Sequence, residues 1–192
     1  MRRHAAEPAQ EDSVLKLDTL ERALRHVQRE LEAVALFEGC LDQIEVVLAY
    51  WPSGWWGECG FVYDRGVGGI AKLAGFREGV IYLPRNAPIS RRRGETLRDV
   101  LRHEYAHALA WVRPSFVRGR WFRETFGARY DEKWDERPVF DPEAYVGEYA
   151  TTSAKEDFAE TFMVCVRGDV LGGRVGEKLE VVRMRALAPR HG

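Results

Sequence analysis

Apolar positions recur at helical spacing near the N-terminus. This stripe, with steps of three and four residues, comprises Leu17, Leu20, Leu24, Val27, Leu31 and Val34. It predicts an amphipathic helix from Asp18 to Glu38, with Gly39 as its C-cap, after a polar start of about 12 residues that we expect to be disordered. The helix could form a dimeric coiled coil, lie across an active site as an inhibitory segment, or dock on the core. We favour docking, because about three heptads is near the minimum for a coiled coil.

Short segments rich in β-branched and aromatic residues predict a small sheet. They are Ile44–Trp51, Phe61–Tyr63 and Gly79–Leu83. The first ends before a proline and has the composition of a buried strand. Trp51, Trp55 and Trp56 fall in the Gly-rich loop that follows. We expect these indoles to cap the core, with a hydrophobic patch for a partner or substrate as the alternative.

The second half of the chain carries both strong and weak helical patterns. An apolar segment from about Thr96, a plausible N-cap, to Trp111 predicts one helix, and a second is predicted from about 154 to 167. Residues 117–134 mix aromatic and charged side chains without clean periodicity, and residues 131–141 have loop composition. Gly176 to Ala188 has a weak helical stripe, which we expect to pack on the outside of the domain.

Composition and charge narrow the classes of function. A chain of 192 residues with 45% hydrophobic content can form one globular domain, which we place at 41–192, with residues 1–40 as an N-terminal extension. The net charge of −1 gives no basic field for nucleic-acid binding. Cys40, Cys59 and Cys165 form no C-x-x-C pair, which fits reduced thiols. No signal peptide or membrane span is evident, so we expect a cytoplasmic protein that binds no membrane, with leaderless export left open.

The helix at 96–111 contains a metal-binding pattern. His103-Glu104-Tyr105-Ala106-His107 has the form H-E-x-x-H. Residues four apart lie on the same face of a helix, so His103 and His107 can offer two imidazole nitrogens to one Zn²⁺. Glu104 then lies beside the metal, where it can act as a general base. A helix with two histidines at its polar edge and a solvated glutamate is the alternative interpretation.

A second motif, Glu156-Asp-Phe-Ala-Glu-Thr-Phe, lies on the helix predicted at 154–167, which Gly168 ends. Ser153 and Glu156 fit a capping box, which explains both residues without a function. In the functional interpretation Glu156 completes a His₂Glu set, with water in the fourth position. Glu160 would share its face and could accept the second ring N–H of a ligand histidine.

The two motifs together carry a family resemblance. H-E-Y-A-H followed some fifty residues later by E-D-F-A-E-T-F resembles the gluzincin clan of zinc metallopeptidases. Tyr149 to Phe162 is similar to the matching stretch of lethal-factor-type catalytic domains, and also to a bacterial family of zinc-binding metallopeptidases. The resemblance covers residues 96–167. It implies an α+β, zincin-like fold, in which a small mixed sheet packs on the H-E-x-x-H helix and a second helix carries the glutamate ligand.

The resemblance implies one Zn²⁺ per chain and a zinc metalloendopeptidase. His103, His107 and Glu156 would hold the metal, Glu104 would accept the proton of a metal-activated water, and Tyr149 would stabilise the oxyanion. The expected partner is a protein or peptide substrate, cleaved with narrow specificity. Self-association or autoinhibition through the 18–38 helix stays open. The alternative function is a non-catalytic zinc-binding interaction module.

Overall fold

The computed structural model of the chain describes residues 16–49, 60–62, 77–85, 96–132, 134 and 136–187. The polar start, the three loop tryptophans and Cys59 lie outside these ranges. Within them, helices combine with one small mixed sheet, as the α+β prediction requires. No helix in the described part of the chain is both long enough and apolar enough to cross a membrane.

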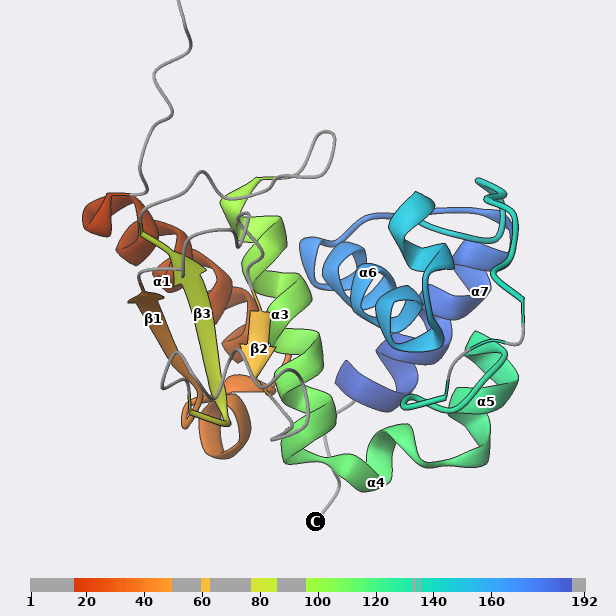
Figure 1. Cartoon of the computed structure of the whole chain (residues 1–192), viewed down its shortest axis with the longest axis horizontal. Helices are drawn as coiled ribbons and strands as arrows, with labels where there is room; N and C mark the ends of the chain where they lie inside the picture. Colours follow the sequence, from red (N-terminus) through yellow and green to blue (C-terminus); the bar gives the residue numbers. More distant parts are fainter. Residues whose placement is uncertain are drawn as a thin grey trace, which may run out of the picture.

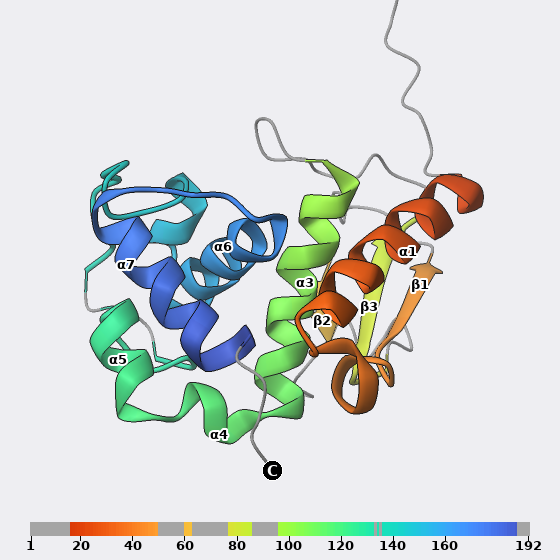
Figure 2. The same cartoon turned by 180° about the vertical axis from the view of Figure 1, so that it is seen from behind.

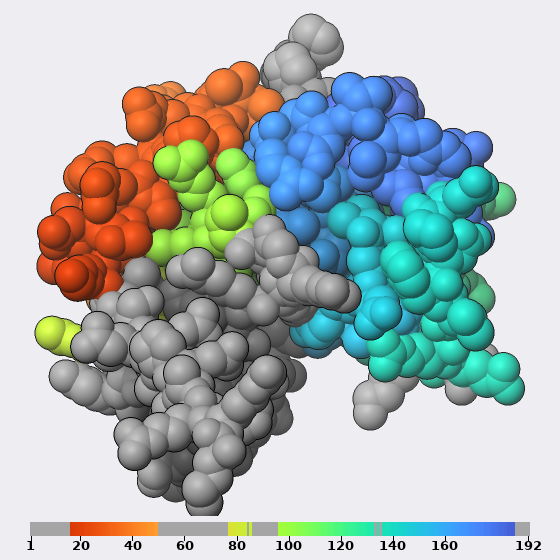
Figure 3. Space-filling model, turned by 90° about the horizontal axis from the view of Figure 1, so that it is seen from above, coloured from red at the N-terminus to blue at the C-terminus, as the bar shows by residue number. Residues whose placement is uncertain are grey.

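The central helix is α3 (Leu97–Val112), which separates two groups of elements (Figure 1). On one side lie the sheet and α1 (Leu17–Ala33), and on the other lie α6 (Ala154–Arg167) and α7 (Gly173–Val182). From behind, α1 lies over the sheet and beside α3 (Figure 2). From above, the surface passes from α1 through α3 to α6 (Figure 3). Side chains on α3 can therefore meet side chains from both groups.

The sheet has three strands in the order β1-β3-β2. They are β1 (Glu45–Ala49), β2 (Gly60–Val62) and β3 (Val80–Pro84). β1 runs parallel to β3, with Glu45 opposite Val80, and β2 runs antiparallel to it, with Phe61 opposite Ile81. The middle strand is buried, whereas Glu45 is exposed and Val46 to Ala49 are only half-buried. The prediction of a buried first strand is therefore wrong, because among the described residues β1 pairs on one side only.

Helix α1 docks on the core, as we expected. Leu20, Ala23, Val27 and Leu31 are buried in the same hydrophobic cluster as the apolar residues of α3, whereas Leu17 is exposed. The stripe therefore meets the chain's own core. Self-association and autoinhibition through this helix stay predictions.

The C-terminal end of α1 differs from the prediction. The helix stops at Ala33, and Ala35 adopts a positive φ of 55°. A π-helical turn, η1 (Phe37–Leu41), follows, and Gly39 lies inside it with a φ of 67°. Gly39 thus has the left-handed conformation of a capping glycine, but it lies in the turn after α1 and does not cap that helix. Cys40, in this turn, and Cys165, in α6, are both buried.

The C-terminal group contains helices that the sequence pattern did not reveal. They are α4 (Pro114–Val117), α5 (Arg120–Phe126) and the 3-10 turn η2 (Glu148–Thr151). Phe122 and Phe126, four residues apart, bury one face of α5. Helix α7 and the following π-helical turn η3 (Arg183–Leu187) correspond to the predicted C-terminal stripe. Val175, Leu179 and Val182 lie in the core, whereas Glu177 and Glu180 are exposed, so the segment packs on the domain through its apolar stripe.

A buried ionic network joins α1 to α3. Arg102 is 4% exposed, and its guanidinium donates two hydrogen bonds to Glu30, at 2.9 and 2.8 Å, and one to Asp99, at 2.7 Å. Truncating Arg102 would leave Glu30 without its guanidinium partner and Asp99 with only that of Arg167, at 3.2 Å. Breaking a buried pair in this way costs about 3–5 kcal/mol. We expect Arg102→Ala to lower the free energy of unfolding by that amount, as measured by urea denaturation.

The matched control is the exposed Arg98 on the same helix, whose guanidinium lies 3.4 Å from a ring nitrogen of His26. Arg98→Ala should change the free energy of unfolding by no more than about 0.5 kcal/mol. Equal losses in the two variants would mean that the buried network contributes nothing beyond helix propensity.

Candidate metal centre

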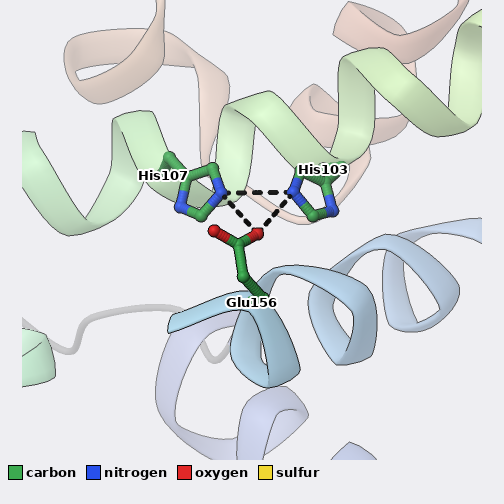
Figure 4. A group of neighbouring side chains, drawn as sticks. All are labelled: His103, His107 and Glu156. Atoms are coloured by element: carbon green, nitrogen blue, oxygen red, sulfur yellow. Dashed lines mark hydrogen bonds and ion pairs between the residues drawn. The ribbon is translucent and has the colours of Figure 1, made fainter. Parts of the chain in front are cut away.

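Strong caps fix the two helices that carry the site. Thr96 forms a reciprocal capping box with Asp99 at the start of α3, because each side chain bonds to the other residue's backbone N–H. At the start of α6, the Ser153 hydroxyl accepts from the Glu156 N–H at 3.4 Å. The Glu156 carboxylate points towards His103 and His107 of α3 (Figure 4), and no reciprocal bond to the Ser153 backbone accompanies this cap. Only half of the predicted capping box forms, and the carboxylate remains available to the histidines.

Three donor atoms converge between α3 and α6. Nε2 of His103 lies 3.1 Å from Oε2 of Glu156 and 3.2 Å from Nε2 of His107. Nε2 of His107 lies 3.4 Å from the same carboxylate oxygen. The three side chains point at one another from the two helices (Figure 4) and are 5–8% exposed. Among the described residues, this is the one group of His, Cys, Asp and Glu side chains that could hold a metal ion.

Electrostatics in this cluster favour a charged His103. Burial alone would lower its pKa, but the hydrogen bond to Glu156, the contact with Glu160 and the nearby charge of Glu104 outweigh burial and raise the pKa to about 10. Burial opposes ionisation of Glu156, but hydrogen bonds to His103 and His107 hold its pKa well below the usual range. A metal ion that binds Nε2 of His103 therefore has to displace a proton.

Each histidine has a second contact at Nδ1. For His103 this is Glu160, whose Oε1 lies 2.8 Å away, although the two groups are not aligned as a hydrogen bond. For His107 it is the Tyr130 hydroxyl, at 2.7 Å. Tyr130 was missed in the sequence because it lies in a segment without periodicity or motif. Its contact with His107 becomes apparent only in the folded structure.

The other two predicted residues lie beside the histidines. Glu104 is 6% exposed on α3, directly after His103 in the chain. Tyr149 is half-buried in η2, and the centre of its ring is 5.9 Å from that of His103. The three predicted ligands and the three other predicted site residues therefore all lie at or beside the His–His–Glu cluster. The roles of Glu104, Tyr149 and Glu160 stay predictions.

Helix α6 is also anchored on its opposite side. Asp157, the residue after Glu156, accepts a 2.6 Å bond from Nζ of Lys178 on α7, and both side chains are buried. Burial raises the pKa of the Asp157 carboxyl to about 6, against the opposing charge of Lys178. Burial likewise lowers the pKa of Lys178. This pair holds α6 on α7 while Glu156 faces α3.

A cavity of about 370 Å³ reaches the cluster from one side. His107 and Tyr130 line this cavity, and Ala110, Trp111 and Val117 supply apolar surface. The charged residues Arg118 and Asp131 also line it. Ala110 and Val117 are each 4% exposed, whereas Trp111 is 40% exposed. A side chain of a bound molecule could enter here next to His107.

Comparison of the chain with protein-family models, with curated proteins and with solved structures gave no match. The chemistry of the site must therefore be argued from its own residues.

Proposed function

We propose that this chain is a zinc metalloendopeptidase of the gluzincin type, with a zincin-like fold similar to lethal-factor-type catalytic domains. The observation that carries the proposal is the convergence of His103, His107 and Glu156, with Glu104 next to the first histidine. Helix packing alone does not require two imidazoles and a carboxylate to share one buried point.

The spacing of the donor atoms supports zinc. Ligands at about 2.0–2.1 Å from a tetrahedral Zn²⁺ lie about 3.3–3.4 Å from one another. The three distances between the donor atoms here are 3.1, 3.2 and 3.4 Å. Two imidazoles and one carboxylate also form a ligand set of catalytic zinc sites, which keep one position open, whereas structural sites use four protein ligands.

The chain's own residues would divide the work of peptide hydrolysis. The chemistry that zinc supplies in such a site is Lewis acidity, which lowers the pKa of a coordinated water and polarises a carbonyl. Glu104 would take up the proton of the attacking water and pass it to the leaving amine. Tyr149, beside His103, would donate its hydroxyl hydrogen to the developing oxyanion. Glu160 would hold the ring of His103 in place.

The cavity beside His107 could receive a side chain of a peptide substrate next to the cleaved bond. Its wall combines apolar surface from Ala110, Trp111 and Val117 with the charged residues Arg118 and Asp131. A wall of this mixed character fits cleavage of a protein partner with narrow specificity.

Metal removal provides the first test. Purified protein with about one zinc per chain by elemental analysis is expected to cleave a mixed peptide library. Dialysis against a zinc chelator should abolish cleavage, and added Zn²⁺ should restore it, because both the bound water and the carbonyl depend on the metal. Cleavage that persists in metal-free protein would exclude this mechanism.

The alternative is a zinc-binding interaction module without catalysis. The burial of all three donor residues favours it, because structural metal sites are closed to solvent. Protein that holds one zinc per chain but cleaves no peptide in the library would support this module and contradict the peptidase.

A further inference from the structure

The second contact of His107 differs chemically from that of His103. His103 faces the carboxylate of Glu160, whereas Nδ1 of His107 lies 2.7 Å from the neutral hydroxyl of Tyr130. We infer that Tyr130 is a positioning residue of the metal centre: its oxygen accepts the Nδ1–H of His107, which keeps Nε2 free to bind metal and fixes the ring. The inference rests on the metal centre of the proposed function, and it does not depend on peptide cleavage.

The tautomer explains why this contact matters. A neutral imidazole carries one proton, so a lone pair on Nε2 requires the proton to be on Nδ1. Nε2 of His107 faces Glu156 and His103, on the side opposite Tyr130. In the absence of an acceptor, a buried Nδ1–H would lose its hydration without compensation. Tyr130 supplies that acceptor.

A phenol suits this position because of the surrounding charge. Glu104, Glu156 and Glu160 already place three carboxyl groups around the two imidazoles. A fourth carboxylate at His107 would add repulsion among them. The Tyr130 hydroxyl fixes the ring without adding charge.

Packing holds Tyr130 rigidly against both helices of the site. The residue is 7% exposed, and its ring centre lies 5.8 Å from that of Phe122 and 6.4 Å from that of Phe158. Phe158 follows Glu156 by two residues on α6, so the helix that carries the carboxylate also supports the tyrosine. His107 and Glu156 are thereby positioned relative to each other through Tyr130 as well as directly.

The test compares Tyr130→Phe with wild type. Phenylalanine keeps the ring packing and removes only the acceptor. Loss of such an outer partner weakens metal binding by about 10–100-fold, and we expect this change in the Zn²⁺ dissociation constant, measured by competition with a chromophoric chelator. The matched control is Tyr145→Phe, at a half-buried tyrosine whose ring faces Lys178. Its dissociation constant should stay within about twofold of wild type.

A second readout separates positioning from a general loss of packing. In zinc-loaded wild-type protein labelled with ¹⁵N in histidine, NMR should show His107 bound through Nε2, with an Nδ1 proton protected from exchange. In Tyr130→Phe that protection should be lost. The wild-type spectrum also tests the inference by itself if the variant fails to fold: metal on Nδ1, or a freely exchanging Nδ1 proton, overturns it.

The remaining outcomes are also decisive. Unchanged zinc affinity in folded Tyr130→Phe, or equal weakening in Tyr145→Phe, overturns the positioning role. Absence of bound zinc in wild type overturns both this inference and the proposed function. Zinc binding that depends on Tyr130 but supports no peptide cleavage overturns only the function.

Discussion

Glu104→Gln is expected to lower kcat/KM for peptide hydrolysis by about 10²–10⁴-fold, the range attributed to general acid–base catalysis, with zinc content unchanged. Glutamine keeps the size of the side chain, which is 6% exposed on α3, but it cannot accept a proton at neutral pH. Glu104 contributes no donor atom to the His–His–Glu cluster, so its loss should leave the metal in place. Peptide cleavage kinetics and elemental analysis on the same sample measure both quantities.

The control for this variant is Glu148→Gln, at an exposed glutamate in η2 next to Tyr149. Its kcat/KM should match that of wild type, because the side chain lies at the surface. If Glu104→Gln cleaves as well as wild type does, Glu104 is not the base and the proposed mechanism is wrong.

Glu156→Ala is expected to remove the metal, and with it all metal-dependent activity. The substitution deletes the anionic donor, whose Oε2 lies within 3.4 Å of both histidine Nε2 atoms. It should also make His103 easier to deprotonate, since the hydrogen bond to Glu156 helps to raise the pKa of His103. Easier deprotonation of His103 favours metal binding, but this effect is smaller than that of losing one of the three ligands. Elemental analysis after dialysis measures the outcome, and circular dichroism verifies the fold.

Glu160→Ala provides the graded comparison. Glu160 contacts Nδ1 of His103 and not the donor side of the ring, so its loss should weaken metal binding by about 10–100-fold without abolishing it. Retention of one metal per chain in Glu156→Ala would contradict the assigned ligand set. Complete loss in both variants would point to a general collapse of α6.

The helices that carry the site were predictable because local signals define them. The first was predicted from about Thr96 to Trp111 and spans Leu97–Val112, with Thr96 capping it. The second was predicted at 154–167 and has those bounds, with Gly168 at a φ of 87° after its last residue. Caps and i, i+4 spacing act within one turn of helix, so the facing histidine pair also follows from the sequence alone.

Features that depend on distant contacts were less predictable. The apolar stripe of α1 continues to Val34 in sequence, yet the chain turns at Ala35 to reach the sheet. Helix α5 is short, and its buried face becomes apparent only when Phe122 and Phe126 meet Phe158 of α6. Tyr130 shares that aromatic cluster, and no local pattern links it to His107. The assignment to the gluzincin clan stays a prediction that rests on the two motifs.

The docking of α1 has a consequence for how the chain could mature. Many proteases are released from inhibition by removal of an N-terminal segment. Here a cut behind α1 would take away Glu30, the partner of buried Arg102, together with Val27 and Leu31 from the core. The product would lose two of the three hydrogen bonds of the buried Arg102 guanidinium, one residue from His103, and would keep only the bond to Asp99. A cut that leaves this core intact would therefore have to lie before Leu17.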